Sequence, residues 1–365
     1  MKLRLLIIRR RYLGDLVLFD PALRSLRETY PGAFITLLVD QGYENVLATH
    51  PAPDRIMALP RRQPGESAFA IGLRYLKLAR ELRSLRFDTC VDYQPNFITE
   101  LFTACAGAAR RIAFVYTDGS ARGRLRINVP VPATAEACRT RHILRNIFEV
   151  CKPLHIPFKG DLHYTIPPAA SAEAEGLLRS LLPDRDGSDP LPYVLLHPGA
   201  RLPARRWPAA SFAAVAAALR QSGRTHVVVV QGGGEEELVR EIARLVPGIP
   251  HLIDPLPLPV FAALAAKAAV YLGNDTGPMH LAAATGTRVI ALFGAQSSVI
   301  WHPVGNGNHV IHPPLPCGDA CVTPDQCDRS NDYRMHCIRR IPVDEVTAVV
   351  LRSLDELADR SRPPA

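Results

Sequence analysis

Residues 269–294 read AVYLGNDTGPMHLAAATGTRVIALFG, and this stretch decides the fold class of the chain. It opens with an apolar run, continues through a helical segment of small residues, and closes on a second apolar run. Short apolar runs on both sides of a helical segment are typical of a buried β–α–β unit with parallel strands. Ligands bind outside the carboxyl ends of the strands in such sheets, so we expect a site where the first strand meets the helix.

The same alternation of strand and helix occurs in two series, which a proline-rich stretch separates. The first series is predicted to hold strands at 3–9, 33–40, 55–60 and 88–93 and helices at 15–31, 70–87 and 98–108. Residues 109–165 are less regular and carry one expected helix, at 139–152. The alternation starts again at 193–199, and a last helix is expected at 343–358. We therefore predict the α/β class, with two doubly wound, Rossmann-like domains that face each other across a cleft.

The length of 365 residues is too great for one ordinary domain. We place an N-terminal domain at 1–170, a linker region at 171–192 and a C-terminal domain at 193–340. The remaining residues, 341–365, are expected to form a C-terminal helix that packs back on the N-terminal domain.

The net charge of +8 favours anionic partners such as phosphates, nucleotides, acidic lipids or nucleic acid. A solvated basic surface without any partner explains the same charge. Aromatic residues make up only 7% of the chain and no RNA-binding motif is present, so we expect no nucleic-acid partner.

No feature of the sequence predicts an exported or membrane-spanning protein. The apolar run at 5–8 is too short for a signal peptide, and no apolar run reaches the length of about 18 residues that a membrane span needs. We therefore expect a cytoplasmic protein. Peripheral attachment to the cytoplasmic face of the inner membrane stays open, because acidic lipids attract basic surfaces.

The junction GNDTGPMH carries residues that suit an anion. Pro278 fits the first turn of a helix, and Thr276 is in place to cap that helix. Gly277 would let a ligand approach the backbone closely, and the free N–H groups of a helix start attract negative charge. Asp275 and His280 flank this point. A well-capped helix without a ligand accounts for the same residues.

The stretch LGDLV places Gly14 and Asp15 between the first strand and the first helix. A carboxylate at the carboxyl end of a strand can act as general base on an incoming hydroxyl. The alternative is an aspartate that only caps the helix.

Two loops of the second series hold further candidates. In HPGARLPARRWP, Arg205 and Arg206 stand where they could neutralise a diphosphate, and surface charge is the alternative. In QGGGEEE, Glu235 or Glu236 would lie near a ribose. The glycines there do not match G-x-G-x-x-G, so a plain turn is an equally good interpretation.

Four cysteines near the end of the chain are spaced C-x3-C-x5-C-x9-C. This is not the spacing of a zinc ribbon, but four thiolates can close a tetrahedral site for structural zinc or iron. Free thiols or an internal disulfide are the alternatives. The candidate ligands are Cys317, Cys321, Cys327 and Cys337.

Three stretches, in their order and spacing, resemble the heptosyltransferases of glycosyltransferase family 9. They are LLIIRRRYLGDLVLFDPALRSLRETYP, HPGARLPARRWP and GNDTGPMHLAAATGTRVIALFG, and the resemblance extends to the late cysteine cluster. It implies a GT-B fold with an acceptor-side N-terminal domain and a nucleotide-sugar-binding C-terminal domain. It also implies inverting transfer of a sugar; the best-known members use ADP-L-glycero-D-manno-heptose as donor and the inner core of lipopolysaccharide as an anionic acceptor.

The resemblance also implies roles for single residues. Asp15 is expected to be the catalytic base, with Gly14 beside the donor. Arg205 takes the place of a family lysine that meets the donor phosphates, which keeps the charge and changes the geometry. Fixed charges and a helix dipole would stabilise the leaving diphosphate, so no cofactor is expected for catalysis. The other expected donor-binding residues are Arg206, Glu235, Asp275, Thr276, Gly277 and His280.

Three other functions fit parts of the sequence. A protein heptosyltransferase acting on autotransporters would use the cysteine cluster as an iron site. A nucleotide-sugar epimerase would share the architecture and isomerise the donor without an acceptor. A catalytically silent nucleotide-binding or nucleic-acid-binding protein would retain the anion site alone.

Overall fold

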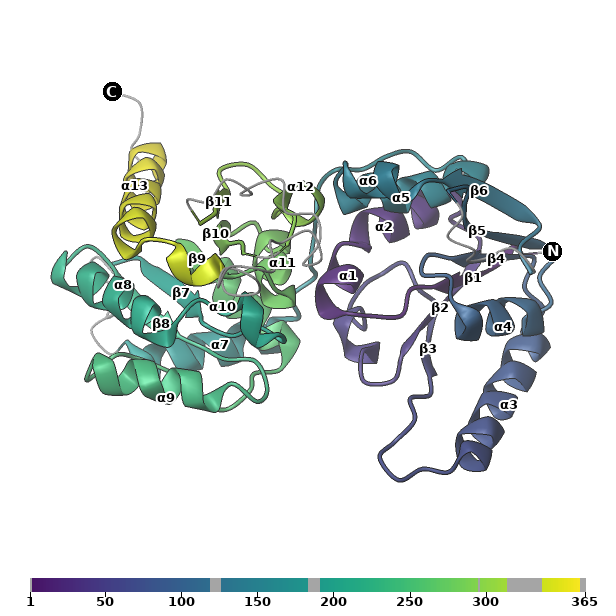
Figure 1. The fold of residues 1–365 in the computed structure, drawn as a ribbon, viewed down its shortest axis with the longest axis horizontal. Coiled ribbons are helices and arrows are strands. Elements are labelled where there is room, and N and C mark those ends of the chain that lie inside the picture. The colour runs from purple at the N-terminus through teal and green to yellow at the C-terminus, as the bar shows by residue number, and fades with distance from the viewer. Residues whose placement is uncertain (1, 119–125, 183–190, 295, 314–336, 362–365) are drawn as a thin grey trace, which may run out of the picture. The chain divides into compact units, whose positions relative to one another are not determined.

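The computed structural model describes residues 2–118, 126–182, 191–294, 296–313 and 337–361, and its chain divides into two compact units (Figure 1). The first unit is Met1–Asp161 and the second is Leu162–Ala365. The expected domain boundary at 170 lies further along the chain, inside the first helix of the second unit. Each unit is an α/β body with one parallel sheet, as the alternation of strands and helices predicts.

The first unit is built on a six-stranded parallel sheet of order β3-β2-β1-β4-β5-β6. Strand β1, near the centre of this sheet, has four apolar residues after Arg4 that have no solvent contact, which is typical of a strand covered on both faces. The strands are β1 (Arg4–Ile8), β2 (Phe34–Asp40), β3 (Arg55–Leu59), β4 (Thr89–Asp92), β5 (Arg110–Tyr116) and β6 (Val129–Ala133).

Helices cover both faces of this sheet (Figure 1). On one face, Leu78 and Leu82 pack with Leu6, Ile8 and Leu38 of the strands. The helical segments are α1 (Leu13–Val17), α2 (Asp20–Thr29), η1 (Glu44–Val46), α3 (Ala68–Ser84), α4 (Phe97–Cys105), α5 (Ala135–Arg139), α6 (Ile143–Val150) and η2 (Lys152–Leu154).

Residues 15–31, expected as one helix, belong to two. Pro21 lies in the first turn of α2, where its missing N–H costs nothing, so a new helix starts there. The break leaves α1 as a single short turn that carries Asp15. The candidate base is therefore held by the strand-to-helix junction rather than by a long helix.

The less regular region 109–165 contains two strands that the periodicity did not predict. β6 reads VPVPA, and two prolines in five residues speak against an interior strand. The strand is possible because β6 lies at the end of the sheet and pairs with β5 alone. Proline has no N–H to donate, so only an edge position tolerates this spacing.

The second unit is built on a five-stranded parallel sheet of order β11-β10-β9-β7-β8. Alternate residues such as Leu196, Leu272 and Leu292 face one large apolar cluster. Tyr193 faces the other side, where its hydroxyl donates to Leu264 O. The strands are β7 (Tyr193–His197), β8 (His226–Val229), β9 (Val270–Asn274), β10 (Arg288–Leu292) and β11 (His309–Ile311).

The stretch quoted at the outset forms the predicted β–α–β unit, because β9 leads through α11 into β10 and the two strands pair in parallel. The helical segments of this unit are α7 (Pro168–Leu181), η3 (Pro203–Arg205), α8 (Ala209–Gln221), α9 (Glu236–Leu245), α10 (Leu258–Lys267), α11 (Gly277–Ala284), α12 (Ser298–Trp301), η6 (Cys337–Arg340) and α13 (Val343–Ser361). None of the described helices combines the length and the apolarity that crossing a bilayer requires.

The last helix, α13, packs within the second unit. Its residues Val346, Val350 and Leu354 belong to the apolar cluster of that unit, together with residues of α8. The expected contact of this helix with the N-terminal domain stays a prediction. The apolar face of the sheet must be covered by helices. α8 and α13 contact each other and pack on the same apolar cluster of strand residues.

We predict that Leu354→Ala lowers the free energy of unfolding of the second unit by roughly 2–5 kcal/mol, because it empties space inside this cluster. Arg352→Ala, on the exposed side of the same helix, should change it by less than about 0.5 kcal/mol. Urea unfolding followed by tryptophan fluorescence measures this unit alone, since both tryptophans, Trp207 and Trp301, lie in it. Equal stability of the two variants would contradict the packing.

Candidate functional site

In the first unit, charged and polar residues gather where β1, β2 and β4 end. Arg9 follows β1, Asp40 closes β2 and Asp92 closes β4. These strands are neighbours and parallel, so their carboxyl ends meet at one edge of the sheet. All three side chains are buried, although each carries an ionisable group. Buried ionisable groups need partners, and the edge supplies them.

Asp15, the expected base, lies at this edge with both carboxylate oxygens engaged. Arg9 Nη2 donates to Asp15 Oδ1 at 2.7 Å, and the backbone N–H of Tyr12 donates to Oδ2 at 2.8 Å. Asp15 therefore forms an ion pair and accepts from the N-cap residue Tyr12 as the third residue of α1, rather than taking the N-cap position itself. Its role as a base stays a prediction. The side chain keeps 16% exposure, and each carboxylate oxygen can accept more than one hydrogen bond. A hydroxyl that reaches this edge can still bind to Asp15.

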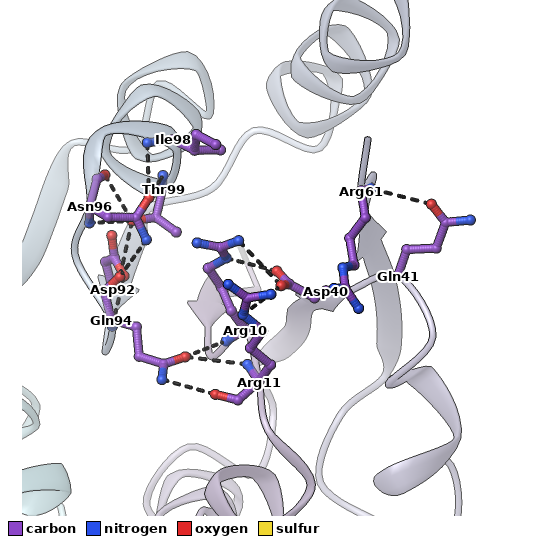
Figure 2. Close-up of polar contacts among 10 residues, drawn as sticks. All are labelled: Arg10, Arg11, Asp40, Gln41, Arg61, Asp92, Gln94, Asn96, Ile98 and Thr99. Atoms are coloured by element: carbon purple, nitrogen blue, oxygen red, sulfur yellow. Dashed lines mark hydrogen bonds and ion pairs between the residues drawn. The ribbon is translucent and has the colours of Figure 1, made fainter. Parts of the chain in front are cut away.

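Two further arginines share one buried carboxylate. Arg10 binds Asp40 through two nitrogens, Nε to Oδ1 at 2.7 Å and Nη2 to Oδ2 at 3.2 Å (Figure 2). Arg11 Nε lies 3.3 Å from the same Oδ2. Asp40 has no exposed surface, whereas Arg11 keeps a third of its side chain exposed. Two cations on one anion leave an excess positive charge at this edge, which suits an anionic ligand.

Gln94 holds the backbone that leads into α1. Its Oε1 accepts from the N–H groups of Arg10, at 3.0 Å, and Arg11, at 3.3 Å, and its Nε2 donates to Arg11 O at 3.0 Å (Figure 2). One side chain from the loop after β4 thus satisfies three backbone groups of the loop after β1. This pairing sets the path of the chain just before Asp15.

Asp92 lies beneath this loop and is fully buried. Its Oδ1 accepts from the backbone N–H of Gln94 at 3.0 Å. Burial raises the pKa of Asp92 to about 7, although hydrogen bonds from Thr99 and Gln94 act in the opposite direction. The group therefore takes up a proton near neutral pH in the folded protein.

In the second unit, Asn274 at the end of β9 connects three segments. Its Oδ1 accepts from Trp207 N at 3.0 Å, and its Nδ2 donates to Pro198 O at 2.8 Å and Gly199 O at 3.1 Å. The side chain has no exposed surface. Asn274 therefore fixes both ends of the loop between β7 and α8, the loop that carries Arg205 and Arg206.

Arg205 and Asp275 form a loose pair beside the start of α11. Arg205 Nη1 lies 3.6 Å from Asp275 Oδ2, which is too long for a strong hydrogen bond. Gln296 also reaches the Arg205 guanidinium when its amide oxygen faces it. Burial raises the pKa of Asp275 to about 6, an effect that the charge of Arg205 reduces. The carboxylate is thus incompletely compensated and can accept hydrogen bonds from a ligand.

The first turn of α11 is without a side-chain cap. Thr276 takes the N-cap position, as expected, but its hydroxyl donates to Asn274 O at 3.3 Å and accepts nothing from the helix. Pro278 lies in the first turn, as expected, and Gly277 opens the helix. The first N–H groups of the helix can therefore bind an anion. His280 lies one turn further on and is 3% exposed.

The carboxylate of Glu235 lies in a buried polar cluster. Its Oε2 lies 3.2 Å from His197 Nε2 and accepts from the Gly232 N–H at 2.9 Å. Burial raises the pKa of Glu235, but His197 and Gly232 outweigh burial and hold the pKa below its ordinary value. A Cβ on Gly199 would lie 1.7 Å from this carboxylate, so a larger residue there would force Glu235 to move. The expected contact of Glu235 with a ribose stays a prediction.

Sequence reasoning did not single out four residues that build these edges: Gln94, Asp92, Asn274 and His197. Three of them stand at strand ends, where a polar residue closes an apolar run, and that signal was available. Arg206 was predicted to meet a diphosphate; its Nε donates to Ala200 O at 2.6 Å, which shapes its own loop.

The expected metal site lies largely outside the described residues, because Cys317, Cys321 and Cys327 fall in 314–336. Cys337 is described, is buried and begins η6. Across the described part of the chain, no group of three or more metal-binding side chains is gathered. A structural zinc or iron at the four cysteines stays a prediction.

The fold and the two edges define a glycosyltransferase with two Rossmann-like domains. The family model of glycosyltransferase family 9 (heptosyltransferase) matches residues 75–329, which is more than half of the chain. The chain therefore belongs to glycosyltransferase family 9.

Individual relatives agree with this assignment. The chain is 27% identical to lipopolysaccharide heptosyltransferase 3 of Escherichia coli K12, over 95% of this chain and 96% of the relative. A family 9 glycosyltransferase from Veillonella parvula has the same fold, with a TM-score of 0.76, 21% identity and 97% of each chain covered. The E. coli ADP-heptose LPS heptosyltransferase II matches with a TM-score of 0.74 and 21% identity, over 98% of this chain and 100% of that one. The fold is thus the GT-B class that the sequence predicts.

We predict that Asp92→Asn removes a pH-dependent loss of stability from the first unit. The folded-state pKa of about 7 lies above the ordinary value of 3.8, so the folded protein binds this proton more tightly than the unfolded chain. Stability contributed by Asp92 is therefore present at low pH and is lost as the pH rises from about 4 to about 8, by roughly 4 kcal/mol.

Hydrogen exchange of the first unit's strands across this pH range measures the effect. The stability difference between Asp92→Asn and the wild type should grow with pH. Glu136→Gln, at an exposed carboxylate of α5, should show no such trend. A constant difference for Asp92→Asn would contradict the raised pKa.

Proposed function

We propose that the protein transfers heptose from ADP-L-glycero-D-manno-heptose to an acceptor in the lipopolysaccharide inner core, with inversion at the anomeric carbon. The observation that carries this proposal is the uncapped start of α11 beside Arg205 and Asp275. Family membership supports glycosyl transfer, and the relatives named above include an ADP-heptose-dependent enzyme and lipopolysaccharide heptosyltransferases.

The second unit would hold the donor. In our proposal the pyrophosphate accepts hydrogen bonds from the first N–H groups of α11 at Gly277, with Arg205 and Arg206 close by. As the bond between the sugar and the phosphate breaks, negative charge develops on the diphosphate. Fixed guanidinium charge and the helix dipole stabilise that charge without reorganising, so this chemistry requires no metal ion.

Asp275 and His280 have separate roles in this proposal. The incompletely paired carboxylate of Asp275 accepts hydrogen bonds from the sugar hydroxyls of the donor. His280 follows one turn into α11 and supports the pyrophosphate side of the site. Gly277 leaves room for the phosphate to approach the backbone.

The first unit would hold the acceptor. Asp15 takes the proton of the attacking hydroxyl while the oxygen attacks the anomeric carbon from the face opposite the diphosphate. The ion pair with Arg9 keeps the carboxylate oriented, and Gly14 leaves space beside it. The excess positive charge of Arg10 and Arg11 over Asp40 favours an anionic acceptor. The two edges must meet around both substrates for the reaction to occur, as in a GT-B enzyme that closes.

The first test is Asp15→Asn, assayed with ADP-heptose and a panel of truncated lipopolysaccharide cores, with products read by mass spectrometry. The amide oxygen can still accept from Tyr12 N–H and cap α1, whereas a neutral amide cannot accept the proton. We expect transfer to fall roughly 10²–10⁴-fold, the contribution typical of a general base. The affinity for ADP, measured by calorimetry, should stay unchanged. Transfer within about tenfold of the wild type would disprove the role of Asp15.

The second test concerns donor binding. Arg205→Ala should weaken ADP binding roughly 10- to 100-fold, because a charge-assisted hydrogen bond to phosphate is lost. Arg205→Lys should restore part of the loss, since it keeps the charge without the planar guanidinium. Arg244→Ala, at an exposed arginine of α9, is the matched control and should bind ADP like the wild type. Unchanged affinity in Arg205→Ala would place the donor elsewhere.

A further inference from the structure

The outward face of α3 in the first unit exposes apolar side chains. The helix buries Ile71, Leu78 and Leu82 against the sheet. On the opposite side, Phe69 is 75% exposed, and Leu73 and Leu76 are about half exposed. Positions separated by four and then three residues lie on one side of a helix. These three side chains, here called the apolar stripe, therefore form one continuous strip over the first two turns.

The same face continues as a row of cations. Lys77, Arg80 and Arg83 are exposed and follow the apolar stripe at helical spacing. Among the described contacts none of the three has an ion-pair partner. The helix has one acidic residue, Glu81, which lies to the side and pairs with Arg55. These three residues, here called the basic row, thus keep their full charge.

A hollow of about 1080 Å³ adjoins the basic row, at the end of α3. Arg80, Arg83 and Arg86 line it together with the last residues of α4. Three arginines against one carboxylate, Asp88, leave the hollow cationic. Its charge suits phosphate groups.

The direction of α3 brings the apolar stripe to the functional edge of the unit. The helix follows β3 through the loop 60–67 and runs back against the strands, so its first turn starts at their carboxyl ends (Figure 1). Arg74 of its second turn confirms this placement, because its Nη2 donates to Gln41 Oε1, next to the end of β2, at 2.6 Å. The first turns of α3, which carry the apolar stripe, therefore lie near the end of β2, the strand that Asp40 closes.

We propose that this face of α3 docks on an anionic lipid bilayer. An interfacial helix places its apolar side chains at the boundary of the acyl chains and its cations among the phosphates. The apolar stripe and the basic row supply both parts on one exposed face. A second copy of the chain fits less well, because it would bury unpaired cations against apolar or equally basic surface.

Docking would bring the protein to the membrane in which the acceptor is anchored. This part of the inference rests on the proposed function. An acceptor anchored in the bilayer by its lipid extends its sugars from the membrane surface. A protein docked through α3 holds the first unit, and with it the Asp15 edge, close to that surface, so the acceptor need not leave the membrane. The lipid partner itself is independent of which sugar is transferred.

Co-sedimentation of the full chain with lipid vesicles tests the proposal. The wild type should bind vesicles of phosphatidylcholine with phosphatidylglycerol, and salt should weaken this binding. Vesicles of phosphatidylcholine alone should bind far less. The triple variant Phe69→Ser, Leu73→Ser, Leu76→Ser should bind both kinds at least roughly tenfold more weakly, because it removes the apolar area that enters the membrane.

The variant Lys77→Gln, Arg80→Gln, Arg83→Gln separates the electrostatic part. It should lose roughly 100-fold in affinity for the anionic vesicles, about a fivefold loss for each cation, and little for the neutral ones. The matched control is Arg240→Gln, Arg244→Gln, Leu245→Ser, which changes an exposed basic and apolar surface on α9 of the second unit. The control should bind vesicles like the wild type.

Three results would overturn the proposal: no binding of the wild type to anionic vesicles, full binding by both α3 variants, or an equal loss in the α9 control. Loss of a dimer in the apolar variant, with vesicle binding retained, would assign the face to a second copy instead. Transfer to a water-soluble, delipidated acceptor should be unchanged in both α3 variants. Failure of transfer in the wild type would count against the proposed function and not against the docking.

Discussion

A parallel strand that is buried on both faces has room for charged side chains only at its ends, where the chain leaves the sheet. The charged and polar side chains of each unit therefore lie at the edge where the carboxyl ends of its strands meet. In the first unit this constraint brings Arg9, Asp40 and Asp92 together from three different strands. In the second it pairs His197 with Gly273, one residue before Asn274. Apolar interiors leave no other place for these groups. Because the strands themselves are buried, the residues of the candidate site lie at the strand ends.

The two edges treat their charges differently. At the first edge, two carboxylates have arginine partners at 2.7 Å, Asp15 with Arg9 and Asp40 with Arg10. The third, Asp92, forms no ion pair among the described residues, and burial raises its pKa to about 7. At the second edge, Asp275 lies 3.6 Å from Arg205, and burial raises its pKa to about 6. The carboxylates of Asp15 and Asp40 are therefore held by their arginines before any ligand binds. The carboxylate of Asp275 keeps hydrogen-bonding capacity that a ligand can complete.

Periodicity predicted the strands with continuous apolar runs and missed those without them. β1, β2 and β9 were found because each contains a run of mostly apolar residues. β6 was missed because Pro130 and Pro132 are excluded from interior strands, and nothing in a local window tells that this strand is an edge. The packing of α13 on α8 was likewise beyond reach, since an amphipathic helix does not encode which apolar surface it will cover.

The sequence alone determined the class of the protein, because two series of alternating strands and helices permit little besides two parallel α/β units. It also determined which junctions matter, since LGD and NDTGP combine glycine with an acid at the end of an apolar run. Only the tertiary structure showed which residues these side chains bind. Contacts across a tight turn or between distant segments involve Arg9, Gln94 and Asn274. Which segments come close enough for these contacts depends on how the strands pair.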